Sequence, residues 1–125
     1  DVSRLPIPPQ ARPKSVTITF ARAEAGALST RVEVIDPTGG RVFAEGTAMP
    51  DGKAAVVKGN LEADVAATSM PSPGVLVMQL SRGGVPASTR IYAVSEDGQS
   101  MVETVAYFDQ DGKPALRANY FSRIR

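Results

Sequence analysis

Glu103 is the residue of this chain whose type and position most suggest chemistry. It interrupts a run of β-branched and aromatic residues, Ser100 to Phe108, and lies near Arg90, Tyr92 and Tyr120 if the neighbouring runs pair as strands. A carboxylate inside such a structure can orient a ligand or act as a general base. The alternative is a cross-strand ion pair on the surface, which contributes under about 1 kcal/mol. The sequence leaves both interpretations open.

A turn signal joins the two runs that carry these residues. Residues 88–94 are followed by Asp97-Gly98 and then by the run that contains Glu103. An Asp-Gly pair between β-rich runs predicts a type I′ hairpin, because that turn needs positive φ at both central residues. With this pair as the tip, Tyr92 faces Glu103 and Arg90 lies diagonally from it.

A second Asp-Gly pair positions the last strand. Asp111-Gly112 precedes residues 115–124, which again read as an extended run. Taking this pair as the tip of a hairpin places Tyr120 opposite Glu103 on one face, by the period of two. A slip of one residue would turn every side chain of that strand to the other face.

Apolar side chains on these runs and on residues 75–80 suggest a wall around a cavity. The candidates are three tyrosines, two phenylalanines and two methionines: Tyr92, Tyr107, Tyr120, Phe108, Phe121, Met78 and Met101. The same residues would equally suit a filled core, since small barrels range from packed to ligand-holding.

The composition excludes several classes of site. The chain has no Cys and no His, so Ser-His and Cys-His catalysis and the usual zinc ligands are absent. Its formal net charge is +1 without a long basic block, which argues against nucleic acid as a partner. No apolar run approaches the about 18 residues that span a bilayer, so we expect no membrane span.

Two other charged groups have simple interpretations. Asp109-x-Asp111-Gly112 resembles the start of a calcium loop, but a third acidic ligand is missing and Tyr120 occupies the place of the bidentate Glu. A hairpin turn is therefore expected there, and no metal site. Arg117, Arg123 and Arg125 are most simply a solvated rim, with an anionic partner as the alternative.

The whole chain predicts one all-β domain. Residues 1–14 hold four prolines and suggest an extended, polyproline-like arm that precedes a single barrel domain at 15–125. Period-two alternation and turn signals predict strands at 15–21, 28–34, 41–47, 53–58 and 75–80. Leu61 to Met70 suits a helix or a short strand, and we interpret it as a strand. The sum is an antiparallel up-and-down β-barrel of about eight to nine short strands, closed so that no edge is exposed.

A family resemblance agrees with this fold. The stretch Thr89 to Met101 (TRIYAVSEDGQSM), then Asp111 to Pro114 (DGKP) and Tyr120, resembles the C-terminal half of small bacterial lipocalin-like, calycin-type proteins of undefined function. Pro13-Lys14-Ser15 and Asp51-Gly52-Lys53 are similar as well. The resemblance implies an exported barrel, periplasmic or secreted, that holds a small apolar molecule. The chain has no Trp, and hence lacks the Gly-x-Trp signature of true lipocalins.

These observations favour non-catalytic binding of a small hydrophobic or amphipathic molecule, with no cofactor. Arg90, Glu103 and a tyrosine hydroxyl would orient the ligand. One alternative is a barrel cyclase or isomerase that uses Glu103 or a Tyr as acid or base. The other is a packed barrel without a cavity that binds a protein partner. The oligomeric state is left open.

Overall fold

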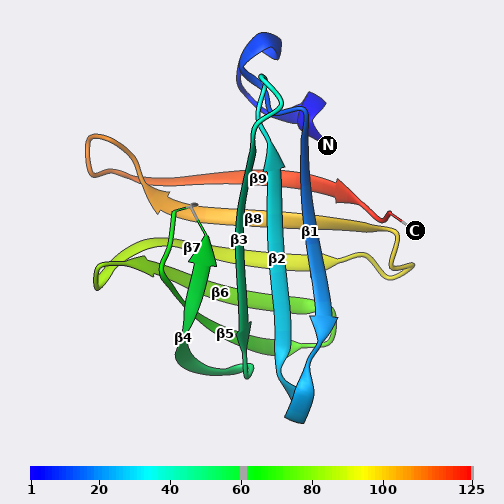
Figure 1. The fold of residues 1–125 in the computed structure, drawn as a ribbon, viewed down its shortest axis with the longest axis vertical. Coiled ribbons are helices and arrows are strands. Elements are labelled where there is room, and N and C mark those ends of the chain that lie inside the picture. Colours follow the sequence, from blue (N-terminus) through cyan, green and yellow to red (C-terminus); the bar gives the residue numbers. More distant parts are fainter. Residues whose placement is uncertain (60–61, 125) are drawn as a thin grey trace.

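The fold is a single antiparallel sheet. A computed structural model describes residues 1–59 and 62–124, which form nine strands and three short 3-10 helices (Figure 1). The strands are β1 (Ser15–Arg22), β2 (Leu28–Ile35), β3 (Arg41–Ala48), β4 (Asp51–Gly59), β5 (Val65–Ser72), β6 (Val75–Arg82), β7 (Val85–Val94), β8 (Ser100–Phe108) and β9 (Pro114–Ser122). The 3-10 helices are η1 (Val2–Arg4), η2 (Pro9–Ala11) and η3 (Glu24–Gly26).

The sheet curls until its two halves face each other. Each strand pairs with the next along the chain, so the strand order is the sequence order. In Figure 1, β1 to β3 cross in front of β5 to β9. Strand β4 forms the corner between the two halves. Its C-terminal end pairs with β3, and its earlier residues pair with β5. The register of the β4–β5 pairing shifts between Asp51 and Ala54. Within the described residues the ladder runs from β1 to β9 without joining those two strands, so the sheet is a half-barrel.

The predicted all-β up-and-down architecture is confirmed, and most strands lie where the alternation placed them. The ambiguous segment at 61–70 is a strand from Val65 onward, while Leu61 itself lies outside the described residues. The strand continues through Pro71 and Ser72. The proline-rich arm is also less extended than predicted, because η1 and η2 interrupt it. A proline suits the first turn of such a helix, where its missing N–H is not needed.

Alternation separates the two faces of each strand. On β6, Leu76, Met78 and Leu80 are buried while the residues between them are half-buried. Together with Ala63, Ala66 and Tyr92 they form the core cluster. Phe20 of β1 reaches this cluster from the opposite half and meets the Tyr92 ring edge-on, with centroids 5.5 Å apart. The core therefore ties the crossing halves together at one end.

The hairpin between β7 and β8 has the predicted register but a different turn. Tyr92 pairs with Glu103, as expected. A type I′ turn is wrong, because Gly98 has φ of 70° while Asp97 has no positive φ. The loop is longer, closed by a hydrogen bond from the backbone N–H of Ser95 to the carbonyl of Ser100. Lengthening the loop symmetrically leaves the pairing unchanged.

The hairpin between β8 and β9 is one residue out of the predicted register. Glu103 pairs with Asn119, and Tyr120 pairs with Val102. The cause is a five-residue loop: Asp109 accepts hydrogen bonds at its side chain from the backbone N–H groups of Asp111 and Lys113, both at 2.9 Å. An odd loop length moves its centre from the Asp-Gly pair to Asp111, so the predicted contact between Tyr120 and Glu103 is wrong. The hairpin itself is confirmed.

The close approach of β3 and β4 requires a glycine at position 59. It has φ of 121°, and a Cβ atom there would lie 2.1 Å from the carbonyl oxygen of Phe43 and 2.9 Å from Cα of Ala44. Backbone atoms cannot rotate away from such a contact. We expect Gly59→Ala to lower the free energy of unfolding by about 3 kcal/mol or more, measured by urea denaturation.

Gly52 supplies the matched control in the same strand. It also has positive φ, 78°, but no atom lies within 4 Å of the position of a Cβ. Gly52→Ala is therefore expected to cost only the left-handed backbone penalty, about 1–2 kcal/mol. Equal losses in the two variants would contradict the steric explanation.

Candidate functional site

A cavity with a volume of about 470 Å³ lies between the two halves of the sheet. The β1 and β2 side of the wall is apolar, and includes Val16, Ile18, Leu28, Val32 and Val34. From β6, Met78 and Leu80 extend this apolar surface.

The N-terminal segment covers part of the cavity. Leu5, Pro6 and Ile7 lie along it, and the guanidinium of Arg4 stacks 3.5 Å from the centre of the Tyr120 ring on β9. The N-terminal segment thus forms part of the cavity wall where no described strand of the sheet covers the cavity.

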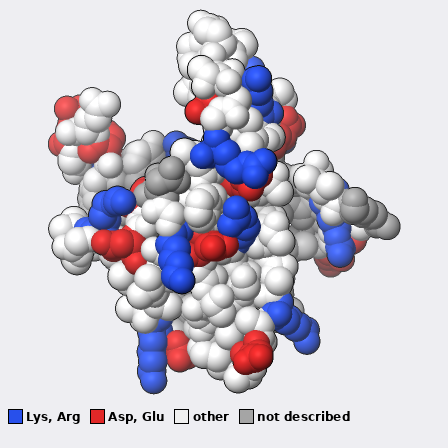
Figure 2. Space-filling view, in the orientation of Figure 1, with Lys and Arg blue, Asp and Glu red and all other residues white. Residues whose placement is uncertain are grey.

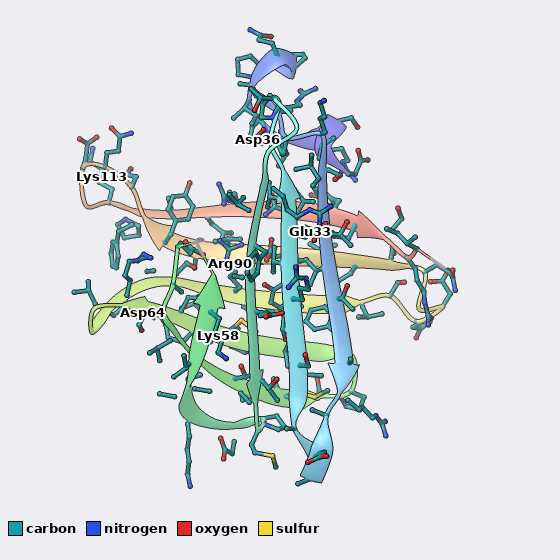
Figure 3. The ribbon with its side chains drawn as sticks, in the orientation of Figure 1. Glu33, Asp36, Lys58, Asp64, Arg90 and Lys113 are labelled. Carbon is teal, nitrogen blue, oxygen red and sulfur yellow. The ribbon has the colours of Figure 1, made fainter. Side chains whose placement is uncertain are left out.

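Arg90 is the centre of a polar cluster on the opposite wall. It projects from β7 in the middle of the molecule, where the two halves cross (Figure 3). Its Nη1 donates a hydrogen bond to Glu103 Oε2 at 3.0 Å. Its Nε donates to Glu62 Oε1 at 3.0 Å, and its Nη2 donates to the same oxygen. Burial alone would lower the pKa of Arg90, but the charges of Glu103 and Glu62 outweigh it and raise that pKa, so the guanidinium stays charged.

Glu103 is buried, with 3% of its surface exposed. One carboxylate oxygen accepts from Arg90, and the other accepts from Asn119 Nδ2 at 2.8 Å. The side chains come from three adjacent strands, β7, β8 and β9, and meet because the strands pair in the observed register. A buried carboxylate is tolerated when an opposite charge and hydrogen bonds compensate its lost hydration. The sequence-predicted pair is therefore an interior ion pair, and the surface alternative is wrong.

Tyr92 lies beside this carboxylate on the same wall. Burial raises the pKa of its phenol, and the charge of Glu103 together with a side-chain hydrogen bond to it raises that pKa further. Arg90 opposes this shift only in part. The phenol is consequently protonated at neutral pH and serves as a hydrogen-bond donor.

Three further members of the cluster were not among the sequence predictions. Glu62 binds Arg90, although 28 residues separate them, and no short-range pattern indicates such a contact. Ser88 donates to Glu62 Oε1 at 3.0 Å. Asn119 would have been found with the correct β8–β9 register, which the loop length decides.

The remaining predicted site residues occupy varied positions. Met78 and Tyr120 lie along the cavity, whereas Met101 packs against the core cluster. Tyr107 lies by a separate hollow, where Arg117 stacks over its ring at 5.6 Å from the centroid.

Phe108, Arg117 and Phe121 lie at the outer parts of this region. Phe121 lies along the cavity, but Phe108 is 68% exposed, so its assignment to the cavity wall is wrong. Arg117 is exposed and also touches the cavity, and Arg125 lies outside the described residues.

Charges on the visible outer face are mixed in sign (Figure 2), and four of them form ion pairs. Figure 2 shows basic and acidic side chains interspersed over β2 and β3. Arg31 contacts Glu45 at 2.7 Å and Glu33 at 3.5 Å, and Arg41 contacts Glu33 at 3.6 Å. These exposed pairs contribute little individually, so the buried Arg90 cluster is the more informative charged group.

The described residues contain no group of three or more acidic residues placed to hold a metal ion. Over the same residues, no helix has the length and apolar character needed to cross a membrane. Asp109 and Asp111 belong to the β8–β9 loop described above.

Comparison with known proteins gives no match: no family model, curated protein or solved structure is significantly similar to this chain. The cavity and its side chains are therefore the features of this chain that bear on its function.

The buried ion pair predicts a large stability effect. Arg90→Met leaves Glu103 charged and without its cationic partner, which we expect to cost about 3–5 kcal/mol. Replacing both residues, as Arg90→Met with Glu103→Leu, should recover much of this loss because the uncompensated charge is gone. Urea denaturation measures the free energy of unfolding of the wild type, the single variant and the double variant.

Arg31→Met is the matched control on the outer face. Arg31 also contacts two carboxylates, but its side chain is 39% exposed. Its loss should therefore cost less than about 1 kcal/mol. A similar cost at both positions would contradict the importance of burial.

Tyr92 predicts a dependence of stability on alkaline pH. Its pKa in the folded protein is raised above the unfolded value of about 10. The contribution to stability is therefore complete below pH 10 and is lost above it, because the unfolded chain releases the proton first. The difference in unfolding free energy between wild type and Tyr92→Phe should fall by about 1.4 kcal/mol per pH unit above pH 10. A constant difference from pH 9 to 11 would contradict the raised pKa.

Proposed function

We propose that this protein binds a small hydrophobic or amphipathic molecule in the cavity between the halves of its sheet, without catalysing a reaction. The observation that carries the proposal is a cavity of about 470 Å³ with an apolar wall on one side and a few convergent polar groups on the other. Ligand sites in proteins have this volume range and this division of the wall.

The driving force is the burial of apolar ligand surface. Each 100 Å² that the cavity covers contributes about 2.5 kcal/mol, before the entropy of association is subtracted. Val32, Leu28 and Met78 supply such surface, while Arg90 and Glu103 are fixed in place by their mutual contacts. Preorganised polar groups lower the cost of orienting a ligand.

The resemblance of the hairpins to lipocalin-like proteins supports the same proposal. Proteins of that kind are exported, so we extend the proposal to a periplasmic or secreted, bacterial binding protein. The half-barrel architecture is compatible with this assignment. The cavity also favours binding over the alternative of a packed interaction module.

Catalysis by Glu103 is the weaker candidate. Both of its oxygens already accept hydrogen bonds, from Arg90 and Asn119. A general base needs access to the substrate proton, and these contacts occupy the carboxylate. Tyr92 is a protonated donor within the same cluster, which suits it to orienting a ligand.

A cavity-blocking substitution tests the proposal. Val32 belongs to the apolar wall, so Val32→Trp should fill part of the cavity and weaken uptake of the neutral apolar probe N-phenyl-1-naphthylamine at least tenfold. Probe fluorescence measures binding, and native mass spectrometry measures its stoichiometry.

Ile91→Trp is the matched control. Ile91 lies on β7 between Arg90 and Tyr92, is 39% exposed and does not line the cavity. This variant should bind the probe like wild type. Absence of probe binding by the wild-type protein would overturn the proposed function.

A further inference from the structure

We infer that the cavity selects ligands whose polar end donates hydrogen bonds, an amine above all, over ligands that end in a carboxylate. This inference rests on the proposed function and specifies the class of ligand. It follows from the way in which donors, acceptors and charges are distributed within the Arg90 cluster.

The donors of the cluster are directed at its own carboxylates. All three nitrogens of Arg90 contact Glu62 or Glu103. Ser88 donates to Glu62, and Asn119 donates to Glu103. An arginine in an apolar cavity would ordinarily attract a carboxylate ligand. Here two protein carboxylates already occupy that position.

The unused capacity is on the acceptor side. Asn119 Oδ1 is buried and has no hydrogen-bond partner among the described residues. Its orientation is fixed, because Nδ2 of the same amide donates to Glu103. A buried acceptor without a partner is costly, but this oxygen is closed off from the cavity, so it shows only that the amide adds no donor to the cluster. The acceptor that a ligand can reach is Glu62 at the edge of the cavity, since 40% of its side chain is exposed.

The charge balance favours the same kind of ligand. Glu62 and Glu103 face one guanidinium, so the cluster has an excess of one negative charge. Such a site repels a carboxylate and attracts an ammonium group, and the low dielectric of the interior strengthens both effects.

Three other charged residues line the cavity without reversing this balance: Asp1, Glu45 and Arg117. The carboxylate of Asp1 accepts hydrogen bonds from the backbone N–H and the hydroxyl of Ser3. Arg117 is exposed and pairs with Val105 in the ladder between β8 and β9. Its guanidinium stacks on the ring of Tyr107, which is farther from Glu103 along β8 than Val105 is. Its guanidinium is thus directed away from the Glu103 end. Glu45 is held by Arg31 at 2.7 Å.

Three amphiphiles with the same ten-carbon chain test the inference: decylamine, decanol and decanoate. Each is titrated against bound N-phenyl-1-naphthylamine at pH 7 and low salt. Decylamine should displace the probe at a concentration at least tenfold lower than decanoate does. Decanol, which carries a donor but no charge, should lie between them.

Glu62→Gln identifies the source of the preference. It removes one charge from the cluster at a partly exposed position, and should reduce the preference for decylamine over decanoate at least threefold. Glu33→Gln is the control, because it removes the same charge from the outer face, away from the cavity. It should retain the wild-type preference.

The outcomes separate the two proposals. If neither the probe nor decanol binds, the proposed function fails and the inference fails with it. If both bind but decanoate competes as well as decylamine, the cavity is a binding site and the inference alone is overturned. An equal effect of Glu62→Gln and Glu33→Gln would assign the preference to overall charge, and would also overturn it.

Discussion

The charge of Glu103 is the constraint on which the arrangement of this cavity depends. Only 3% of the residue is exposed, so the hydration of its carboxylate must be replaced by contacts within the protein. Arg90 and Asn119 supply them from the strands on either side. These contacts hold only when β7, β8 and β9 pair in one register, so an interaction in the interior also fixes the alignment of three strands.

The division of polar and apolar side chains follows from this constraint. Strands β7 to β9 present the Arg90 cluster to the cavity, whereas β1 and β2 present aliphatic side chains to it. On the outer side of β2 and β3, charged pairs such as Arg31 and Glu45 are partly exposed to water. The curl of the sheet brings the apolar inner face of one half opposite the polar cluster of the other half. The cavity between them therefore has one apolar wall and one polar wall.

Local patterns made much of this fold predictable. Alternation over 28–34 and the Asp97-Gly98 signal concern residues that are close in sequence. The first led to a correct strand, and the second led to the correct pairing of β7 with β8. The pair formed by Arg90 and Glu103 followed from that hairpin. A turn can change type without changing the register, which is why the incorrect type I′ assignment did no harm to the position of Tyr92.

The errors concern quantities that local patterns do not determine. Asp111-Gly112 indicated a turn, but the hydrogen bonds accepted by Asp109 decide that the loop has five residues. The contact of Glu62 with Arg90 depends on how β4, β5 and β7 curl around the cavity, and nothing within a few residues of either encodes it. Hydrophobic alternation likewise shows which residues share a face, but leaves open whether that face encloses space.

The β8–β9 loop has an evolutionary consequence. Its length sets which alternate residues of β9 face inward, and Asn119 and Phe121 now do so. Deleting or inserting one residue between Phe108 and Pro114, with the ladder re-formed, would bring Leu116 and Ala118 inward and turn the amide of Asn119 outward. A single-codon change at a surface loop could thus convert a polar strip of the cavity into an apolar one. Homologous chains that differ only in this loop length would then differ in ligand chemistry while keeping the same strands.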